Sequence, residues 1–141
     1  MSWQGYIDSL MKNEWVADAA IFGYAAGKES CWAAKPDGWL KDITAAEIKV
    51  LVANDHSSLF ANGVTLAGRK CTMLRDALHV DGQNTMDLKM KTSDKEPDPF
   101  PFTVGKSQQA VVVARGIKDA HGGKVNCPVY DMTAYLRKMN Y

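Results

Sequence analysis

Hydrophobic residues at the start of the chain recur at the spacing of one face of an α-helix. Over residues 1–11 the apolar side chains are separated by three or four positions, which gives one continuous stripe on a helix. Ser2 precedes the stripe, and its hydroxyl can cap the first turn. A second stripe of the same kind runs from Val125 to Met139. We therefore expect a helix at each end of the chain.

Large aromatic residues lie on or beside both stripes. Trp3 and Tyr6 belong to the first stripe, and Tyr135 and Tyr141 lie beside or beyond the second. An indole N–H or a phenol O–H needs a hydrogen-bond partner when the ring is covered, so these side chains suit a flat apolar surface that also donates hydrogen bonds. We expect the two terminal helices to pack side by side and present such a surface. Spacing alone leaves an ordinary amphipathic helix, packed on a core, as the alternative.

Between the two stripes the pattern is typical of β-strands joined by turns. In one segment Met86, Leu88 and Met90 alternate with charged residues, as in a strand with one buried face. The Asp81-Gly82 pair before it is the strongest hairpin signal in the chain. Strands are predicted at residues 17–24, 30–34, 64–67, 70–78, 85–91, 100–104 and 109–114.

One more helix is predicted between the second and third strands. Thr44 and Glu47 have the spacing of a capping box, in which each side chain bonds the other residue's backbone amide. The helix is expected to end near Asn54. Residues 57–61 are expected to form a short helical turn or a loop, and residues 92–99 a polar surface loop.

Glycine and proline set two further expectations. Gly68 is expected to mark a bulge or a close approach within the sheet. Pro128 lacks an amide donor and would break a helix if it lay deep inside. The last helix is therefore expected to begin near Asn126, after a turn at His121, with Pro128 in its first turn.

The order of elements predicts the fold class. A helix, two strands, a helix, about five strands and a final helix, joined mostly by hairpins, indicate an α+β fold. We expect a central antiparallel β-sheet with helices packed on both faces and the N- and C-terminal helices side by side. With 141 residues, the chain is long enough for one core, so a single domain is expected over residues 1–141.

Charge and cysteine content exclude several classes of protein. The net charge is +1, which favours no partner through bulk electrostatics and argues against nucleic acid. No signal peptide is expected, and no apolar run reaches the ~18 residues that span a bilayer. Three cysteines without close pairing fit free thiols in a reducing compartment. We expect a cytoplasmic protein.

The sequence contains no clear catalytic or metal-binding pattern. Gly27-Lys28 does not follow the phosphate-loop spacing, and Glu29 stands where Ser or Thr should follow the lysine. The three histidines are scattered, with no ligand-like spacing to cysteine or acid. A small hydrolase or transferase would need a nucleophile beside a base, which the sequence does not offer. No catalytic residue, metal or cofactor is expected.

A cluster of basic residues is the stronger signal. Lys70, Arg75, Lys89 and Lys91 fall on the two strands joined by the Asp81-Gly82 hairpin. One interpretation is a solvated sheet face. The other is a patch that binds an acidic protein or anionic lipid headgroups.

Several sequence blocks, in this order and spacing, resemble a profilin of the animal type over essentially the whole chain. The blocks are WQGYIDSLM, DAAIFGY, CWAA, ITAAEIKVL, FANGVTLAGRKCTMLRD, MDLKMK, HGGKVN and YDMTAYLRKMNY. The resemblance implies a monomeric, non-enzymatic protein of the cytoplasm and cytoskeleton. It implies binding to monomeric actin, to proline-rich proteins such as formin-like nucleation and elongation factors, and to phosphatidylinositol bisphosphate. It also implies that the protein promotes actin nucleotide exchange and regulates filament assembly.

The resemblance also implies residue roles, carried over by position. The polyproline-binding residues would be Trp3, Tyr6, Trp32, Tyr135 and Tyr141. The actin-binding residues would be Lys70, Thr72, Met73, Arg75, Lys89, Lys91, His121, Gly123, Asn126, Tyr130 and Asp131. The lipid-binding residues would be Lys70, Arg75, Lys89, Lys91, Arg137 and Lys138. Met73 and Thr72 have the alternative interpretation of plain sheet residues.

The chain departs from the family pattern at three places. Tyr135 stands where vertebrate relatives have a histidine, and Gln83 stands where an acid is often found. Cys127-Pro128 replaces a basic pair. These changes leave open an alternative: a lipid- and polyproline-binding adaptor with weakened actin affinity.

Overall fold

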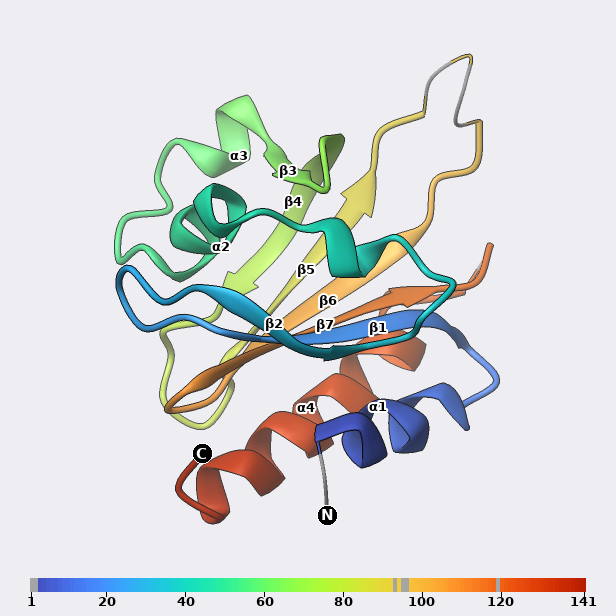
Figure 1. Ribbon diagram of the computed structural model, residues 1–141. Coiled ribbons are helices and arrows are strands. Elements are labelled where there is room, and N and C mark those ends of the chain that lie inside the picture. The colour runs from blue at the N-terminus through green and yellow to red at the C-terminus, as the bar shows by residue number, and fades with distance from the viewer. Residues whose placement is uncertain (1–2, 93, 95–96, 119) are drawn as a thin grey trace.

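A curled antiparallel sheet of seven strands forms the centre of the computed structural model, which describes residues 3–92, 94, 97–118 and 120–141 (Figure 1). The strand order is β2-β1-β7-β6-β5-β4-β3, and each neighbouring pair is antiparallel. The strands are β1 (Val16–Gly23), β2 (Ser30–Ala34), β3 (Val64–Leu66), β4 (Arg69–Ala77), β5 (Thr85–Met90), β6 (Pro101–Lys106) and β7 (Ala110–Gly116).

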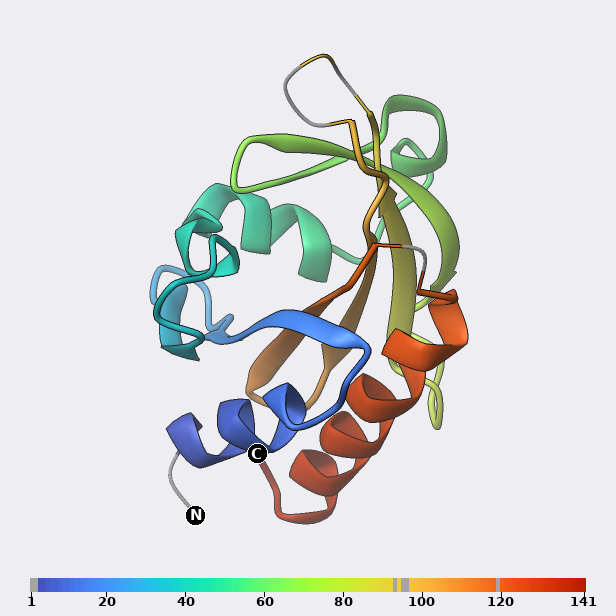
Figure 2. The same cartoon turned by 90° about the vertical axis from the view of Figure 1, so that its right-hand side faces the viewer.

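Helices cover both faces of this sheet, as predicted. The two terminal helices, α1 (Trp3–Met11) and α4 (Gly122–Lys138), lie side by side on one face (Figures 1 and 2). The other face carries the short helices η1 (Leu40–Asp42), α2 (Ala45–Val52) and α3 (Leu59–Asn62). No helix in the described ranges is long and apolar enough to cross a bilayer. The Ser2 cap predicted for the first helix lies outside the described residues.

The core has two parts, one on each side of the sheet. Side chains of β7 alternate between them: Val111 and Val113 pack under α2 and η1, whereas Val112 and Ala114 pack under α1 and α4. All four are fully buried, and burying one valine side chain is worth about 1.5–3 kcal/mol. The continuous apolar run of this strand therefore reflects its central place in the sheet.

The predicted capping box starts α2 and also supports the neighbouring hairpin. The Thr44 hydroxyl accepts from the Glu47 amide at 3.2 Å, and the Glu47 carboxylate accepts from the Thr44 amide at 2.9 Å. The same carboxylate accepts from the amides of Ala67 and Gly68. Burial alone would raise the pKa of Glu47, but these hydrogen bonds and one from the Thr65 hydroxyl lower it. The side chain thus links α2 to the β3–β4 turn as a carboxylate.

Gly68 forms neither the bulge nor the close approach that a glycine there would permit. Leu66 pairs with Arg69, so Ala67 and Gly68 form a two-residue hairpin turn. Both have positive φ, 52° and 80°, which is the geometry that matches the twist of the flanking strands. The Asp81-Gly82 signal does mark the β4–β5 hairpin, but the connection there is longer and runs over residues 78–84.

The predicted start of the last helix was wrong. The helix begins at Gly122 rather than near Asn126, so Pro128 lies inside it and beyond the first turn. A proline there removes one helical hydrogen bond and costs about 3 kcal/mol. Val125 and Val129 on the same helix are fully buried against the sheet. Packing of this face therefore holds the helix together around the proline.

Candidate functional site

Five aromatic side chains, four from the two ends of the chain and one from β2, lie close together. The Trp3 ring lies at the centre, with its centroid 4.8 Å from Trp32, 5.4 Å from Tyr141 and 5.5 Å from Tyr6. The ring of Tyr135 lies 6.0 Å from that of Tyr6. These separations are typical of interacting aromatic pairs. The structure thus brings together all five residues of the predicted polyproline set, called the aromatic cleft below.

The rings of the aromatic cleft are positioned by α1, β2, α4 and the C-terminal residue. Trp3 and Tyr6 are three residues apart on α1 and share one side of the helix. Trp32 on β2 covers Gly23 of β1 so closely that a Cβ atom at Gly23 would lie 2.5 Å from the indole. The C-terminal residue is held because the Tyr141 carbonyl accepts from the Ser107 hydroxyl at 2.9 Å and from the Gln109 amide.

The aromatic cleft is apolar at its base and open to solvent at its edges. Tyr6 is only 6% exposed, whereas Trp32, Tyr135 and Tyr141 are 36–45% exposed. Burial, with a smaller contribution from Tyr135, raises the pKa of Tyr6, so its hydroxyl keeps its proton at neutral pH. Exposed rings with N–H and O–H donors at their edges can stack on a ligand and donate hydrogen bonds to it.

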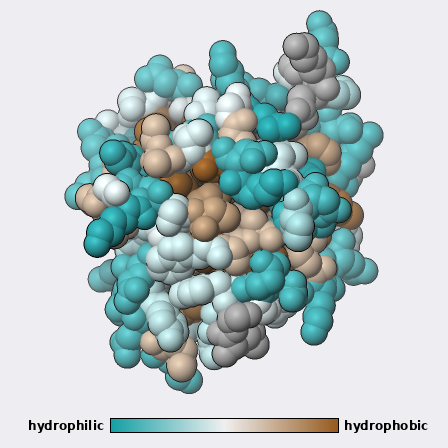
Figure 3. All heavy atoms as spheres, viewed as in Figure 1, coloured by the Kyte–Doolittle hydropathy of each residue, from teal (hydrophilic) through white to brown (hydrophobic). Residues whose placement is uncertain are grey.

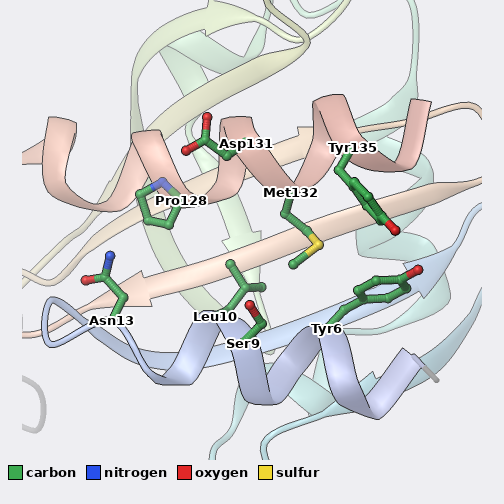
Figure 4. Close-up of a pocket in the computed structure, with 8 residues that line it drawn as sticks. All are labelled: Tyr6, Ser9, Leu10, Asn13, Pro128, Asp131, Met132 and Tyr135. Carbon is green, nitrogen blue, oxygen red and sulfur yellow. The ribbon is translucent and has the colours of Figure 1, made fainter. Parts of the chain in front are cut away.

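A groove continues from the aromatic cleft between α1 and α4 (Figure 4). The Tyr6 and Tyr135 rings face each other at one end of it, and Leu10 and Met132 provide apolar surface between the helices. The cavity is about 370 Å³. Sequence reasoning missed this groove because it depends on how the two helices pack. Its lining residues are Tyr6, Ser9, Leu10, Asn13, Pro128, Asp131, Met132 and Tyr135.

The second candidate region is the outer surface of β4 and β5, called the β4–β5 face below. Thr72 pairs with Lys89 across the two strands, and the Lys70 carbonyl accepts from the Lys91 amide. The three lysines are exposed. Met73 is different: it is 4% exposed and packs in the core under α2. Its side chain points inward because residues alternate along β4, so it offers no surface on this face.

Arg75 is held in a polar network within the β4–β5 face. Its guanidinium donates to the Asp87 carboxylate at 2.7 Å and to the Thr85 hydroxyl at 2.5 Å. Asp87 also accepts from the Thr103 hydroxyl at 2.8 Å and from the Asn126 amide group at 3.1 Å. Arg75 is therefore largely neutralised within the fold, and Asn126 ties α4 to the sheet beside it.

The other residues of the predicted actin set lie around this network or along α4. The Tyr130 hydroxyl donates to the Gly82 carbonyl at 3.1 Å. His121 and Lys89 line one hollow of about 300 Å³, and Gly123 is exposed nearby in sequence. Asp131, in contrast, borders the groove between α1 and α4.

The predicted lipid set falls into two groups. Lys70, Lys89 and Lys91 belong to the β4–β5 face, together with Arg75. Arg137 lies near the end of α4, where its guanidinium donates twice to the Lys106 carbonyl, at 3.0 and 2.8 Å. Lys138 next to it is exposed. Burial, and then the charge of Arg137, lowers the pKa of Lys106.

The two most exposed large apolar side chains of the described residues were absent from the predicted sets. Leu74 is 57% exposed and Phe60 is 56% exposed. Pairing of β4 with β5 shifts between Met73 and Arg75, so Leu74 occupies a bulge and Arg75 still pairs with Asp87. Alternation after Met73 already points Leu74 outward, but only the bulge puts Arg75 on the same face.

The cysteines are free thiols in the structure. Cys31 and Cys127 are exposed and Cys71 is buried. Burial raises the pKa of Cys71 to about 12, with a smaller contribution from Glu47, so this thiol stays protonated. Within the described ranges, no three His, Cys, Asp or Glu side chains are grouped so that they could hold a metal ion.

Comparison with known proteins identifies the family. The profilin family model matches residues 1–141. This chain belongs to the profilin family. Profilin-1 of Mus musculus is 44% identical over 139 residues, which is 99% of this chain and 98% of the relative. Profilin-2 of Homo sapiens is 39% identical over the same shares of the two chains.

Solved profilin structures have the same fold. Mouse profilin IIa, in complex with a double repeat from the FH1 domain of mDia1, superimposes with a TM-score of 0.94 at 37% identity and covers 100% of both chains. Rat profilin 2a gives 0.91 at 38% identity, over 99% of this chain and 96% of that one. The predicted fold class and family resemblance are therefore confirmed. Profilins are non-enzymatic and generally bind actin and polyproline.

Proposed function

We propose that this profilin binds proline-rich segments in the aromatic cleft. The contact of the Trp3 ring with Trp32, Tyr6 and Tyr141 is the observation that carries this proposal. A polyproline II helix is already ordered and exposes its carbonyls, so indole N–H and phenol O–H groups can bind it at little cost in entropy. A relative in the mouse was solved with formin FH1 repeats, which favours formin-like partners here.

Actin monomers would bind the β4–β5 face together with the first half of α4. The Arg75–Asp87–Asn126 network supports this assignment because it fixes the sheet and the helix relative to each other. The side chains proposed to contact actin are Lys70, Thr72, Arg75, Lys89, Lys91, His121, Asn126, Tyr130 and Asp131, with the backbone at Gly123. Binding there would promote nucleotide exchange on actin and regulate filament assembly, in the cytoplasm and without catalysis by the profilin itself.

Phosphatidylinositol bisphosphate would bind the exposed lysines of the β4–β5 face and, at the other end of α4, Arg137 and Lys138. Each exposed Lys or Arg near an anionic membrane contributes about 1 kcal/mol. Because three lysines are shared with the proposed actin surface, lipid and actin would compete. The aromatic cleft uses different residues, so a proline-rich segment and actin could be bound together.

An adaptor with weakened actin affinity is the second candidate. The uncharged Gln83 and the Cys127-Pro128 pair remove charges that the resemblance leads one to expect. Gln83 does accept from the Arg75 guanidinium at 3.4 Å, and α4 continues as a helix through Pro128. Neither change interrupts the backbone there, and the family generally binds actin, which favours the actin-binding function over the adaptor.

A tryptophan-fluorescence titration with a proline decamer tests the cleft, beside a scrambled Gly/Ser peptide as control. A saturable change with the decamer alone is expected, since Trp3 and Trp32 lie in the cleft. A folded protein that gives no change would overturn the cleft assignment. Release of a fluorescent nucleotide from monomeric actin then tests the second surface: acceleration is expected, and its absence together with vesicle binding would favour the adaptor.

A further inference from the structure

One histidine is enclosed between two hydrogen-bond acceptors. His56 lies in the connection between α2 and α3 and is 6% exposed. Its Nδ1 atom is 2.8 Å from the Asp76 carboxylate on β4. Its Nε2 atom is 2.8 Å from the Leu51 carbonyl in the last turn of α2. The Leu51 carbonyl can only accept a hydrogen bond, and so can the Asp76 carboxylate when it is ionised. Both ring nitrogens therefore face a hydrogen-bond acceptor.

These two contacts determine which protonation state of His56 satisfies its hydrogen-bond partners. Neutral imidazole has one N–H and one lone pair, so one of its nitrogens would face an acceptor without a proton between them. Imidazolium has two N–H donors and satisfies both. The carbonyl end of α2 also favours a positive charge. We infer that His56 is a proton-dependent clamp, which in its imidazolium form joins the end of α2 to β4.

The other titratable groups around the clamp support a positive charge at His56. The Asp55 carboxylate is its neighbour in sequence; hydrogen bonds from Ser57 lower the pKa of Asp55, and the charge of His56 contributes. The His79 ring lies with its centroid 5.2 Å from that of His56. His79 Nε2 is 2.8 Å from the Ala53 carbonyl, a contact that neutral imidazole satisfies with a single N–H.

Loss of the proton from His56 leaves one of its two acceptors without a donor and removes a hydrogen bond between the ring and α2 or β4. The clamp therefore stabilises the α2–α3 connection in the imidazolium form and weakens in the neutral form, independently of proline or actin binding.

Nitrogen NMR of the full chain, labelled in its histidines, tests the inference directly. At about pH 6.5, a value inside the histidine titration range, both His56 nitrogens are expected to carry protons. The thermal midpoint is expected to fall by roughly 3–6 °C between about pH 6.5 and 8.5 as one hydrogen bond is lost. A His56 spectrum of neutral imidazole at the lower pH would overturn the inference, and no variant is needed for this measurement.

The substitution Asp76→Asn separates the clamp from other sources of pH dependence. An asparagine amide can donate to Nδ1 of a neutral ring whose Nε2–H still bonds Leu51, so both contacts survive without the extra proton. In this variant the thermal midpoint should change much less between the two pH values than in the unmodified chain. His79→Gln, on the neighbouring ring, is the matched control and should show the same decrease in midpoint as the unmodified chain. If Asp76→Asn shows the same pH dependence as the unmodified chain, His56 is not the clamp.

Discussion

The aromatic cleft and the β4–β5 face hold their side chains in opposite ways. In the cleft, Trp3 packs against three other rings, all of them uncharged. On the β4–β5 face, Arg75 is joined to Asp87 and to the Thr85 hydroxyl, while Lys70, Lys89 and Lys91 remain exposed. The interactions of the aromatic cleft therefore depend mainly on contact between rings, and those of the β4–β5 face depend mainly on charge.

This difference predicts how each region responds to salt. Screening shortens the reach of exposed charges to about 8 Å at physiological ionic strength, but it has little effect on stacked rings. Proline binding should therefore vary little with added salt, whereas binding to anionic vesicles should weaken steeply.

Truncating the central ring of the cleft should have the largest effect. Trp3→Ala removes a side chain that touches Trp32, Tyr6 and Tyr141. A buried aromatic anchor is typically worth about 3 kcal/mol of binding free energy, roughly a 100-fold loss in affinity. Calorimetry with the proline decamer measures it. Stimulation of nucleotide release from actin should be retained, since the β4–β5 face is unchanged.

Trp15→Ala is the control for that experiment. Trp15 lies just before β1, where the Lys124 ammonium sits 5.5 Å from its ring, outside the aromatic cleft. The Trp15→Ala substitution should leave the affinity for the proline decamer within a few fold of that of the unmodified chain. Equal losses in the two variants would mean that tryptophan truncation acts through the fold, and the contrast between the regions would fail.

The cleft was accessible from the sequence because its determinants are local. Trp3 and Tyr6 share one helical face by spacing alone, the second stripe brought in Tyr135 and Tyr141, and the resemblance supplied Trp32. What the sequence does not reveal is the close approach of Trp32 to Gly23, because that contact depends on the register between β1 and β2. The groove between α1 and α4 was missed because it depends on how these two helices pack.

Reversing one exposed charge should have the next largest effect, and only on the β4–β5 face. Lys89→Glu removes one favourable charge and adds a repulsive one, about 2 kcal/mol near an anionic membrane, or roughly a 30-fold loss of vesicle binding. Actin binding should weaken as well, and proline binding should not change. Cosedimentation with vesicles that contain phosphatidylinositol bisphosphate measures the first effect.

Lys49→Glu is the charge-matched control. Lys49 is an exposed residue of α2, on the opposite side of the sheet from α1 and α4. If both reversals reduce vesicle binding equally, net charge rather than the β4–β5 face controls lipid affinity. Loss of proline binding in Lys89→Glu would instead point to a disturbed fold.

The β4–β5 face was harder to predict because its geometry departs from strict alternation. The pattern of Met86, Leu88 and Met90 placed β5 correctly. On β4, however, the shift in pairing between Met73 and Arg75 moves one side chain to the other face, and no residue in that segment signals a bulge. Pro128 is a similar case: packing of α4 on the sheet overrides a rule that holds for an isolated helix.

Removing one hydroxyl should have the smallest effect and shows how far the cleft relies on hydrogen bonds rather than on stacking. Tyr135 is 45% exposed and contacts the Tyr6 ring. In Tyr135→Phe the ring stays while the donor is lost, so proline affinity should fall by roughly 2–5-fold, the value of about one hydrogen bond. Tyr130→Phe on the same helix is the matched control, because its hydroxyl donates to Gly82 and should not affect proline binding. Calorimetry compares the two. An unchanged affinity in Tyr135→Phe would show that the Tyr135 ring binds proline through stacking and not through its hydroxyl. The contrast between this uncharged cleft and the charged β4–β5 face would then be sharper.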